Sequence, residues 1–312
     1  MGHSRFIMTN APADTPVCYR HAKRETYVRC SRCDRYICPD CMRAAAVGQH
    51  CLECVREGSK GVRQPRTITA GQIGGARIGG GAVVTCSLIA INVAAYIVEL
   101  VRPGVVNRFS MVGEALMHGG NLFVYQGLGT FFGYQPVGVA HGQWYRLITG
   151  TFLHEPPGQG IGILHIALNM WWLFMLGPIL EARLGKLRFV ALYLLSALGS
   201  SVLVYLLASQ QPTIGASGAV FGLVGAYFVI GRRFSIDRAN STRLLVYSGI
   251  WLVVSSAIDS WQGHLGGLIT GILVGLAYAF VPPRRIAVQV AAVSGVAVLL
   301  IIAIVLRTGQ LL

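Results

Sequence analysis

Residues 161–180 read IGILHIALNMWWLFMLGPIL, and no side chain in this stretch carries a formal charge. A helix of about 20 apolar residues is long enough to cross the roughly 30 Å hydrocarbon core of a bilayer. Residues 189–208 and 286–306 are two further uncharged stretches of similar length. Such runs are hard to explain as buried helices of a soluble protein, so the sequence predicts transmembrane helices.

The composition of the whole chain agrees with a membrane protein. Of its 312 residues, 54% are apolar and only 12% are charged, and the mean hydropathy is +0.57. Soluble domains carry about 25% charged residues, so a soluble enzyme is excluded. The predicted fold class is an all-α polytopic membrane protein. Its predicted spans are residues 81–101, 161–180, 189–208, 214–231, 244–258, 264–281 and 286–306.

Lysine and arginine positions predict the orientation of these spans. Positive side chains concentrate in cytoplasmic loops, and here they concentrate in every second connection. The bias predicts a cell-membrane protein with its N-terminus inside and its C-terminus outside. It also explains much of the net charge of +14, so no nucleic-acid partner is expected. The predicted cytoplasmic residues are Lys60, Arg63, Arg66, Arg77, Arg183, Lys186, Arg188, Arg232, Arg233, Arg238, Arg243, Arg284 and Arg285.

The long segment 102–160 falls on the outer side of the membrane in this orientation. It is rich in aromatic residues but is interrupted by glycine and proline, so we expect it to lie in the outer interface. Arg146, beside Trp144, is expected to anchor this segment structurally. At the inner end of the second span, Glu181 and Arg183 are interpreted as solvated flanking charges.

Four polar side chains lie inside predicted spans, where polar groups are costly and indicate functional sites. His165 and Asn169 are four residues apart in the second span and therefore share one helix face. Ser217 and His264 lie near the starts of the fourth and sixth spans. Because these three spans all run from outside to inside, the four residues fall within ~13 Å of the outer boundary. They are predicted to form one polar layer.

Small residues predict contact between the fourth and sixth spans. Faces with a small residue at every fourth position let helix backbones approach closely in lipid. Ser217 and His264 lie at the outer ends of two such faces, and an imidazole is a suitable base for a serine nucleophile. The glycines concerned are Gly218 and Gly222 in one span, and Gly267, Gly271 and Gly275 in the other.

Each of these features also has a structural interpretation when it is taken alone. A membrane serine usually bonds to its own helix backbone, and glycine runs by themselves indicate only packing. His165 and Asn169 are suited to hydrogen bonding between helices. The occurrence of all four residues at one depth favours the functional interpretation.

The combined motifs resemble the rhomboid family of intramembrane serine proteases. The resemblance covers residues 81–282 and implies a six-helix core, with residues 283–312 as the additional C-terminal helix of many members. The matching stretches are Gly215-Ala216-Ser217-Gly218, His264-Leu265-Gly266-Gly267, His165-xxx-Asn169 followed by Met170-Trp171-Trp172, and Gly142-Gln143-Trp144-Tyr145-Arg146-Leu147-Ile148-Thr149.

The resemblance implies a serine endopeptidase that needs no cofactor for catalysis. Ser217 would be the nucleophile and His264 the general base and then the acid. His165, Asn169 and the backbone N–H of Ser217 would form the oxyanion hole. The implied substrates are single-pass membrane proteins within the lipid bilayer, cut near the outer ends of their helices. The outer loop and the fifth span are the family's candidates for lateral gating.

The sequence departs from the family pattern at a few positions. Phe221 stands one turn after Ser217, where members often have tyrosine; its ring could still stack on His264. The spacing between His154 and His165 is longer than usual, which leaves the role of His154 open. Asp259 precedes His264 by five residues, and we interpret it as a loop residue because the family works without a carboxylate.

The N-terminal residues form a cysteine-rich segment of a different kind. Ligand-type residues occur in pairs separated by two positions, and this spacing is typical of tetrahedral zinc sites. Eight ligands predict two structural zinc ions, whereas disulfides are not expected in the reducing cytoplasm. Such a short domain has little core, so the metal is expected to fold it. The ligand pairs are Cys18 and His21, Cys30 and Cys33, Cys38 and Cys41, and Cys51 and Cys54.

The pairing of these ligands has two solutions. A resemblance to cross-braced B-box or RING-like modules implies Cys18, His21, Cys38 and Cys41 on one ion and Cys30, Cys33, Cys51 and Cys54 on the other. Sequential pairing is the alternative, and His50 is a further possible ligand. Residues 1–57 are thus predicted to be a cytoplasmic zinc-binding domain for a protein partner, joined through a Gly-rich basic linker, 58–80, to the membrane domain.

Two other functions are compatible with parts of the sequence. A non-catalytic rhomboid-like protein would bind membrane clients, but inactive relatives typically lose the serine or histidine that is present here. A zinc-regulated transporter is disfavoured because the spans lack the buried carboxylates that coupling usually needs.

Overall fold

The computed structural model describes residues 15–45, 47–60, 82–124, 132–234, 238–255, 261–282 and 284–312. The chain divides into two compact units, Met1–Thr69 and Ala70–Leu312, and the boundary falls inside the predicted linker. Most of this linker, 61–80, lies outside the described residues, as does Asp259.

In its described residues, 15–45 and 47–60, the first unit has two small antiparallel hairpins and one helix. Strands β1 (Val17–Cys18) and β2 (His21–Glu25) form one hairpin, and β3 (Met42–Ala44) and β4 (Gln49–Cys51) form the other. Helix α1 spans Leu52–Lys60. The buried core of this unit holds one aliphatic side chain, Ile37, and is otherwise made of thiols. These belong to Cys18, Cys30, Cys38, Cys41, Cys51 and Cys54.

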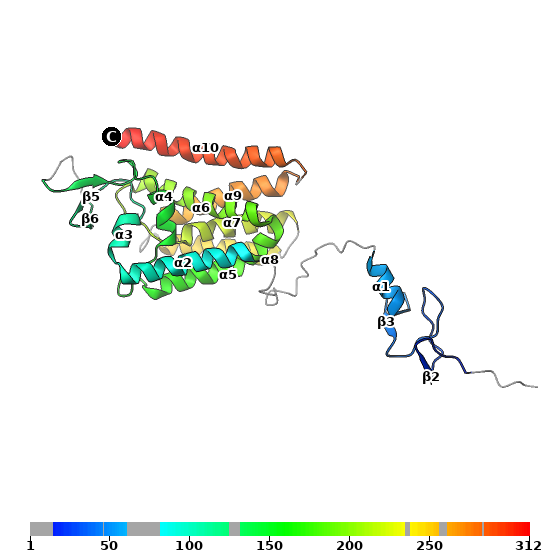
Figure 1. Ribbon diagram of the computed structural model, residues 1–312. Helices are drawn as coiled ribbons and strands as arrows, with labels where there is room; N and C mark the ends of the chain where they lie inside the picture. The colour runs from blue at the N-terminus through cyan, green and yellow to red at the C-terminus, as the bar shows by residue number, and fades with distance from the viewer. Residues whose placement is uncertain are drawn as a thin grey trace, which may run out of the picture. The chain divides into compact units, whose positions relative to one another are not determined.

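The second unit is a bundle of long helices with a small sheet at one end (Figure 1). The sheet has the antiparallel order β6-β5-β7, from strands β5 (Ala115–His118), β6 (Asn121–Phe123) and β7 (Gln135–Val137). Short helices flank it: α3 (Gly104–Phe109), α4 (Arg146–Thr149) and the 3-10 helix Gly150–Phe152. The long helices are α2 (Val83–Val101), α5 (Ile163–Leu184), α6 (Lys186–Leu207), α7 (Ser217–Arg233), α8 (Arg238–Ser255), α9 (Trp261–Phe280) and α10 (Ile286–Leu311).

The described residues of each of the seven predicted spans include a helix, and five of these helices are long and apolar enough to cross a membrane: α2, α5, α6, α9 and α10. The fold is therefore a polytopic helical membrane fold. In their described residues, α7 and α8 do not meet these criteria of length and apolar composition. Helix α7 has 17 residues, and α8 begins with the polar sequence RANSTR. That these two helices also span stays a prediction.

Helix α7 lies at the centre of the bundle and contacts α5, α6, α8 and α9. Glycine makes this position possible, because α7 and α9 approach through their backbones, as the small residues predicted. A Cβ atom added at Gly267 would overlap the carbonyl oxygen of Gly218, and one added at Gly271 would overlap that of Gly222. Helix α10 packs against α6 and α9 along one side of the bundle (Figure 1).

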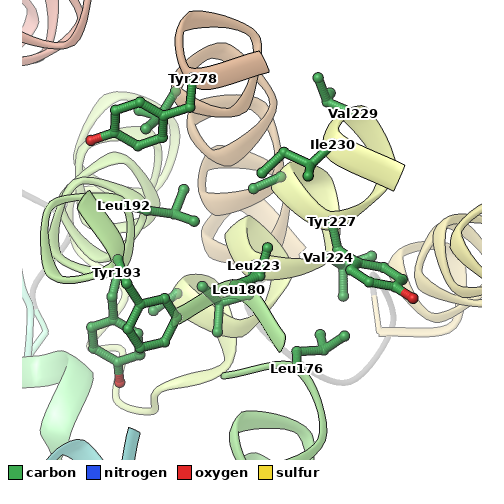
Figure 2. Close-up of a cluster of buried hydrophobic side chains, with 14 of the residues drawn as sticks. Leu176, Leu180, Leu192, Tyr193, Leu223, Val224, Tyr227, Val229, Ile230 and Tyr278 are labelled. Atoms are coloured by element: carbon green, nitrogen blue, oxygen red, sulfur yellow. The ribbon is translucent and has the colours of Figure 1, made fainter. Parts of the chain in front are cut away.

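A hydrophobic cluster fills the part of the bundle around α7 (Figure 2). Leu176 and Leu180 from α5 meet Leu192 and Tyr193 from α6, and α7 contributes the largest share of the side chains. Leu180, Leu192 and Tyr193 are fully buried. Close packing of this kind fixes the relative heights of the helices, and so the depth of any polar group that they carry.

Glu181 is not the solvated flanking charge that the sequence predicted. Its side chain is only 2% exposed. Its two carboxylate oxygens accept hydrogen bonds from the backbone N–H of Val84 (2.9 Å), the backbone N–H of Thr85 (2.8 Å) and the Thr85 hydroxyl (2.8 Å). First-turn N–H groups have no acceptor within their helix, and the positive end of the helix dipole favours a carboxylate. Glu181 of α5 therefore caps α2.

The helix contact of α7 and α9 is sensitive to a single methyl group. We expect Gly271→Ala to lower the free energy of unfolding by about 1–3 kcal/mol through overpacking against Gly222. The matched control is Gly295→Ala on α10, where nothing lies within 4 Å of the added Cβ. There, the better helix propensity of alanine should stabilise the protein by up to ~1 kcal/mol. Thermal unfolding in detergent measures both, and equal shifts would contradict the packing argument.

Candidate active site

Ser217 is the first residue of α7, and the loop before it is tied to the rest of the bundle. Met111 and Thr213 exchange two backbone hydrogen bonds (2.9 and 2.8 Å), and the N–H of Gly215 donates to the carbonyl of Gly150 (3.0 Å). Gly215 has φ +124°, and a Cβ there would lie 2.7 Å from Nε2 of His165. Only glycine fits this turn, which brings the start of α7 against α5.

The structure brings Ser217 and His264 into direct contact. Nε2 of His264, on α9, lies 2.9 Å from Oγ of Ser217. The imidazole is 2% exposed, and the Phe221 ring stacks on it with a centroid distance of 4.5 Å and an interplanar angle of 9°. Phe221 thus makes the stacking contact expected at this position. The stacked ring restricts rotation of the imidazole, so the nitrogen stays directed at the hydroxyl.

His165 and Asn169 are both buried on the face of α5 that looks toward Ser217. Nδ2 of Asn169 donates to the carbonyl of His165 (2.9 Å). Nδ1 of His165 accepts a hydrogen bond from the backbone N–H of Glu155 (3.3 Å). In a neutral imidazole, a nitrogen that accepts leaves the proton on the other nitrogen. A neutral His165 with this bond carries its proton on Nε2, the nitrogen next to Gly215.

The four predicted residues border one cavity of about 320 Å³ between α5, α7 and α8. The rest of its wall is mostly apolar: Ile161, Leu168, Trp172, Val220, Phe221, Val224, Tyr247, Ser248 and Trp251. A second, smaller hollow of about 30 Å³ lies where Ser217 and His264 meet Thr151, Ser200 and Ser201. This hollow is large enough to admit a water molecule.

Arg146 anchors the outer segment, as the sequence predicted. It is fully buried, and its Nε donates to Oε1 of Gln143 (2.6 Å). Its Nη1 donates to the carbonyl oxygens of Asn107 (3.1 Å) and Ser110 (2.8 Å). One guanidinium thus links α4 to the end of α3, which keeps the segment in place beside the cavity.

Sequence reasoning left the role of His154 open and did not single out Glu99, which lies in the first predicted span; the expectation that the spans lack buried carboxylates was therefore wrong. Both are buried next to the site: the His154 ring lies 5.3 Å from that of His165, and Glu99 of α2 accepts from the His154 backbone. A signal for Glu99 was present. The buried polar residues of α2 recur at helical spacing and so share one face of the helix: Thr85, Asn92, Tyr96 and Glu99.

The first unit brings the eight predicted metal ligands into two groups. The groups are Cys18, His21, Cys38 and Cys41, and Cys30, Cys33, Cys51 and Cys54. Within each group the ligand atoms lie within 4.8 Å of one another, and all eight cysteines of the chain, each within the described residues, are free thiols. This is the cross-braced arrangement, not the sequential one, and His50 belongs to neither group. Three thiols with an imidazole, and four thiols, are both donor sets that suit tetrahedral zinc.

Comparison with known proteins identifies the family. Residues 141–281, which hold all four predicted site residues, match the Rhomboid domain. Over 143 residues the chain is 35% identical to rhomboid protease GluP of Bacillus subtilis. Over 150 residues it is 34% identical to YdcA of the same bacterium, whose name also refers to a rhomboid protease. It is 28% identical over 196 residues to RHOMBOID-like protein 9, chloroplastic, of Arabidopsis thaliana.

The extent of these matches is uneven. They cover 45%, 46% and 60% of this chain, and 27%, 72% and 40% of the respective relatives. The chain therefore spans less than half the length of two of these three relatives. Fold and site together define a polytopic helical membrane protein with a serine–histidine pair whose imidazole is buried. The chain belongs to the rhomboid family.

Proposed function

We propose that this rhomboid family member is an intramembrane serine endopeptidase, which hydrolyses peptide bonds in or near the transmembrane segments of membrane proteins. The observation that carries the proposal is the 2.9 Å distance between Nε2 of His264 and Oγ of Ser217 at the wall of a largely apolar cavity. A serine hydroxyl is a weak nucleophile until a base in hydrogen-bond contact takes its proton.

The reaction proceeds through an acyl-enzyme. Oγ of Ser217 attacks the scissile carbonyl carbon while its proton passes to His264, and the imidazolium then donates that proton to the leaving amine. Water, deprotonated by His264, attacks the ester carbonyl, and the proton returns to Oγ as the carboxyl product leaves. The two steps regenerate the enzyme without a cofactor.

Negative charge that develops on the carbonyl oxygen has donors beside Ser217. The backbone N–H of Ser217 belongs to the first turn of α7, where N–H groups have no acceptor in their own helix. A neutral His165 would present Nε2–H next to Gly215. Donors fixed in a site that excludes bulk water stabilise an oxyanion more than donors in water do. Asn169 already donates to the His165 carbonyl, and its second amide hydrogen would be the one available to substrate.

Single-pass membrane proteins are the proposed substrates, and the cavity supports this class. Its wall is formed by apolar side chains from α5, α7 and α8, so a substrate segment would enter from lipid past α8. The distribution of lysine and arginine supports a cell-membrane location with the site toward the outer side and the N-terminal unit in the cytoplasm.

The two ligand groups of the N-terminal unit are proposed to bind one zinc ion each. The support is the donor chemistry, since sets of three or four thiolates with or without an imidazole are typical of structural zinc sites. The ions would be structural, and the unit would serve as a docking module for a protein partner.

Labelling with a fluorophosphonate probe tests the proposed enzyme. We expect the probe to modify wild-type protein in detergent on the peptide that contains Ser217, and to leave Ser217→Ala unmodified. Ser248→Ala is the matched control, because Ser248 lies on α8 in the wall of the same cavity. Equal labelling of Ser217→Ala and wild type would overturn the proposal, and would favour a client-binding protein without catalysis.

A further inference from the structure

Glu99 is a buried carboxylate that the proposed reaction does not use. It lies in the last turn of α2 and is 1% exposed. Its Oε2 and Oε1 lie 3.0 and 3.3 Å from the backbone nitrogen of His154, whose N–H donates to them. A carboxylate in an apolar interior is costly unless hydrogen bonds compensate it, so its position requires an explanation.

The peptide next to the one that Glu99 binds makes a hydrogen bond to the His165 ring. The next N–H along the chain, that of Glu155, donates to Nδ1 of His165 (3.3 Å). The Glu155 carboxylate lies at the outer limit of ion-pair distance, with Oε2 4.0 Å from Nδ1, and this oxygen accepts from the N–H of Ile161 (2.7 Å). Residues 154 and 155 therefore determine which His165 nitrogen accepts, and so which one donates.

The side chain of His154 supports the same ring from another direction. It meets the His165 ring edge-on at a centroid distance of 5.3 Å, and the Tyr96 ring lies across it at 6.4 Å and 90°. Burial, with a smaller contribution from His165, lowers the pKa of His154 to about 3. The ring is therefore neutral at ordinary pH. His154 binds Glu99 through its backbone N–H, not through an ion pair.

A second buried carboxylate, Glu181 of α5, has a purely structural role at α2 and serves as a comparison. Glu181 is as deeply buried as Glu99, and its hydrogen bonds end on Val84 and Thr85, at the opposite end of α2. None of those partners contacts His165 in the bonds that the structure describes. Glu99 differs because its partner is one peptide away from the group that orients His165.

We propose that Glu99 is a positioning residue for the oxyanion hole: it holds the 154–155 backbone so that His165 presents Nε2–H to the carbonyl oxygen of the substrate. This inference rests on the proposed proteolytic function. A positioned donor must stay within a fraction of an ångström of its acceptor, since a misplacement of about 1 Å costs on the order of 10²-fold in rate.

A double-mutant cycle in the full-length protein tests the proposal, with kcat and KM measured on a single-pass substrate in liposomes. We expect Glu99→Leu to lower kcat by about 10–100-fold, with KM changed less than about 3-fold. Glu99→Gln, whose carboxamide oxygen still accepts from His154, should keep kcat within about 5-fold of wild type. His165→Ala should lose about 10²–10³-fold, and adding Glu99→Leu to it should cost less than about 3-fold more.

Additive losses would overturn the inference. If Glu99→Leu lowers kcat by the same factor in the wild-type and His165→Ala backgrounds, its effect is structural. The control Glu181→Leu is expected to give such equal factors in the two backgrounds. Wild-type kcat in Glu99→Leu would overturn it as well. If Glu99→Leu does not fold, Glu99→Asp carries the same cycle, because it withdraws the carboxylate by one methylene. Cleavage by Ser217→Ala would instead refute the proposed function, and the two failures are thereby distinct.

Discussion

Ser217→Ala is expected to reduce kcat for cleavage of a single-pass substrate by at least about 10⁴-fold, as in serine proteases that lose their nucleophile. The physical reason is that the acyl-enzyme route disappears. His264 keeps its place against Phe221 but has no hydroxyl to deprotonate. Single-turnover cleavage in proteoliposomes measures the effect, with substrate in the same bilayer as the enzyme.

The pair should also behave as a unit. We expect His264→Ala to cost nearly as much as Ser217→Ala, and the double variant to be no slower than either, because each single change already removes the nucleophilic route. Ser248→Ala, in the wall of the same cavity, should keep kcat within about 2-fold of wild type, as expected for a residue outside the reacting pair. Losses that multiply in the double variant would show that the two residues act independently, contrary to the 2.9 Å contact.

Removal of metal is expected to unfold the N-terminal unit while leaving the membrane unit folded. Apart from Ile37, the core of the N-terminal unit consists of the ligand thiols themselves, so little apolar burial remains when the ions leave. Apparent binding energies of about 10 kcal/mol or more per structural zinc at pH 7 exceed what such a core contributes. We therefore expect a strong chelator to make residues 15–58 protease-sensitive in the full-length protein, while residues 82–312 stay resistant.

Metal content and two cysteine variants make this prediction specific. Purified protein should hold two zinc ions per chain, one for each ligand group. Cys33→Ser removes a ligand and should lose one ion, whereas Cys86→Ser, on α2 outside both groups, should keep both. A protein without zinc, whose N-terminal unit resists protease in chelator, would refute the metal assignment.

Helix positions followed from the sequence because hydrocarbon imposes a simple rule on composition. The uncharged run 189–208 is α6 (Lys186–Leu207) and the run 286–306 is α10 (Ile286–Leu311), with boundaries moved by a few residues where charged side chains extend the helix. The outer segment was harder. The short helix α3 is held by tertiary contacts such as those of Arg146, and the strands by their pairing with one another. Such contacts leave no periodic pattern in the sequence.

The error at Glu181 has a related cause. A glutamate at the end of an apolar run is ordinarily solvated, and nothing local shows that the first turn of α2, almost a hundred residues earlier, will lie beside it. Glu99 is similar: its polar spacing on α2 was visible, but its partner at His154 was not. Buried charges are explained by the groups that compensate them, and those groups belong to other helices.

The order of amino acids by itself determined that this chain is a bundle of membrane helices, which residues are chemically suited to a site, and which residues are suited to metal. Apolar length, small-residue spacing and paired thiols are local properties, so they can be found along the chain. Tertiary structure alone decided that His264 lies 2.9 Å from Ser217, that the ligands group in the cross-braced order, and that two carboxylates are buried. These outcomes depend on distances between residues far apart in the sequence, and such distances follow from the close packing of the whole unit.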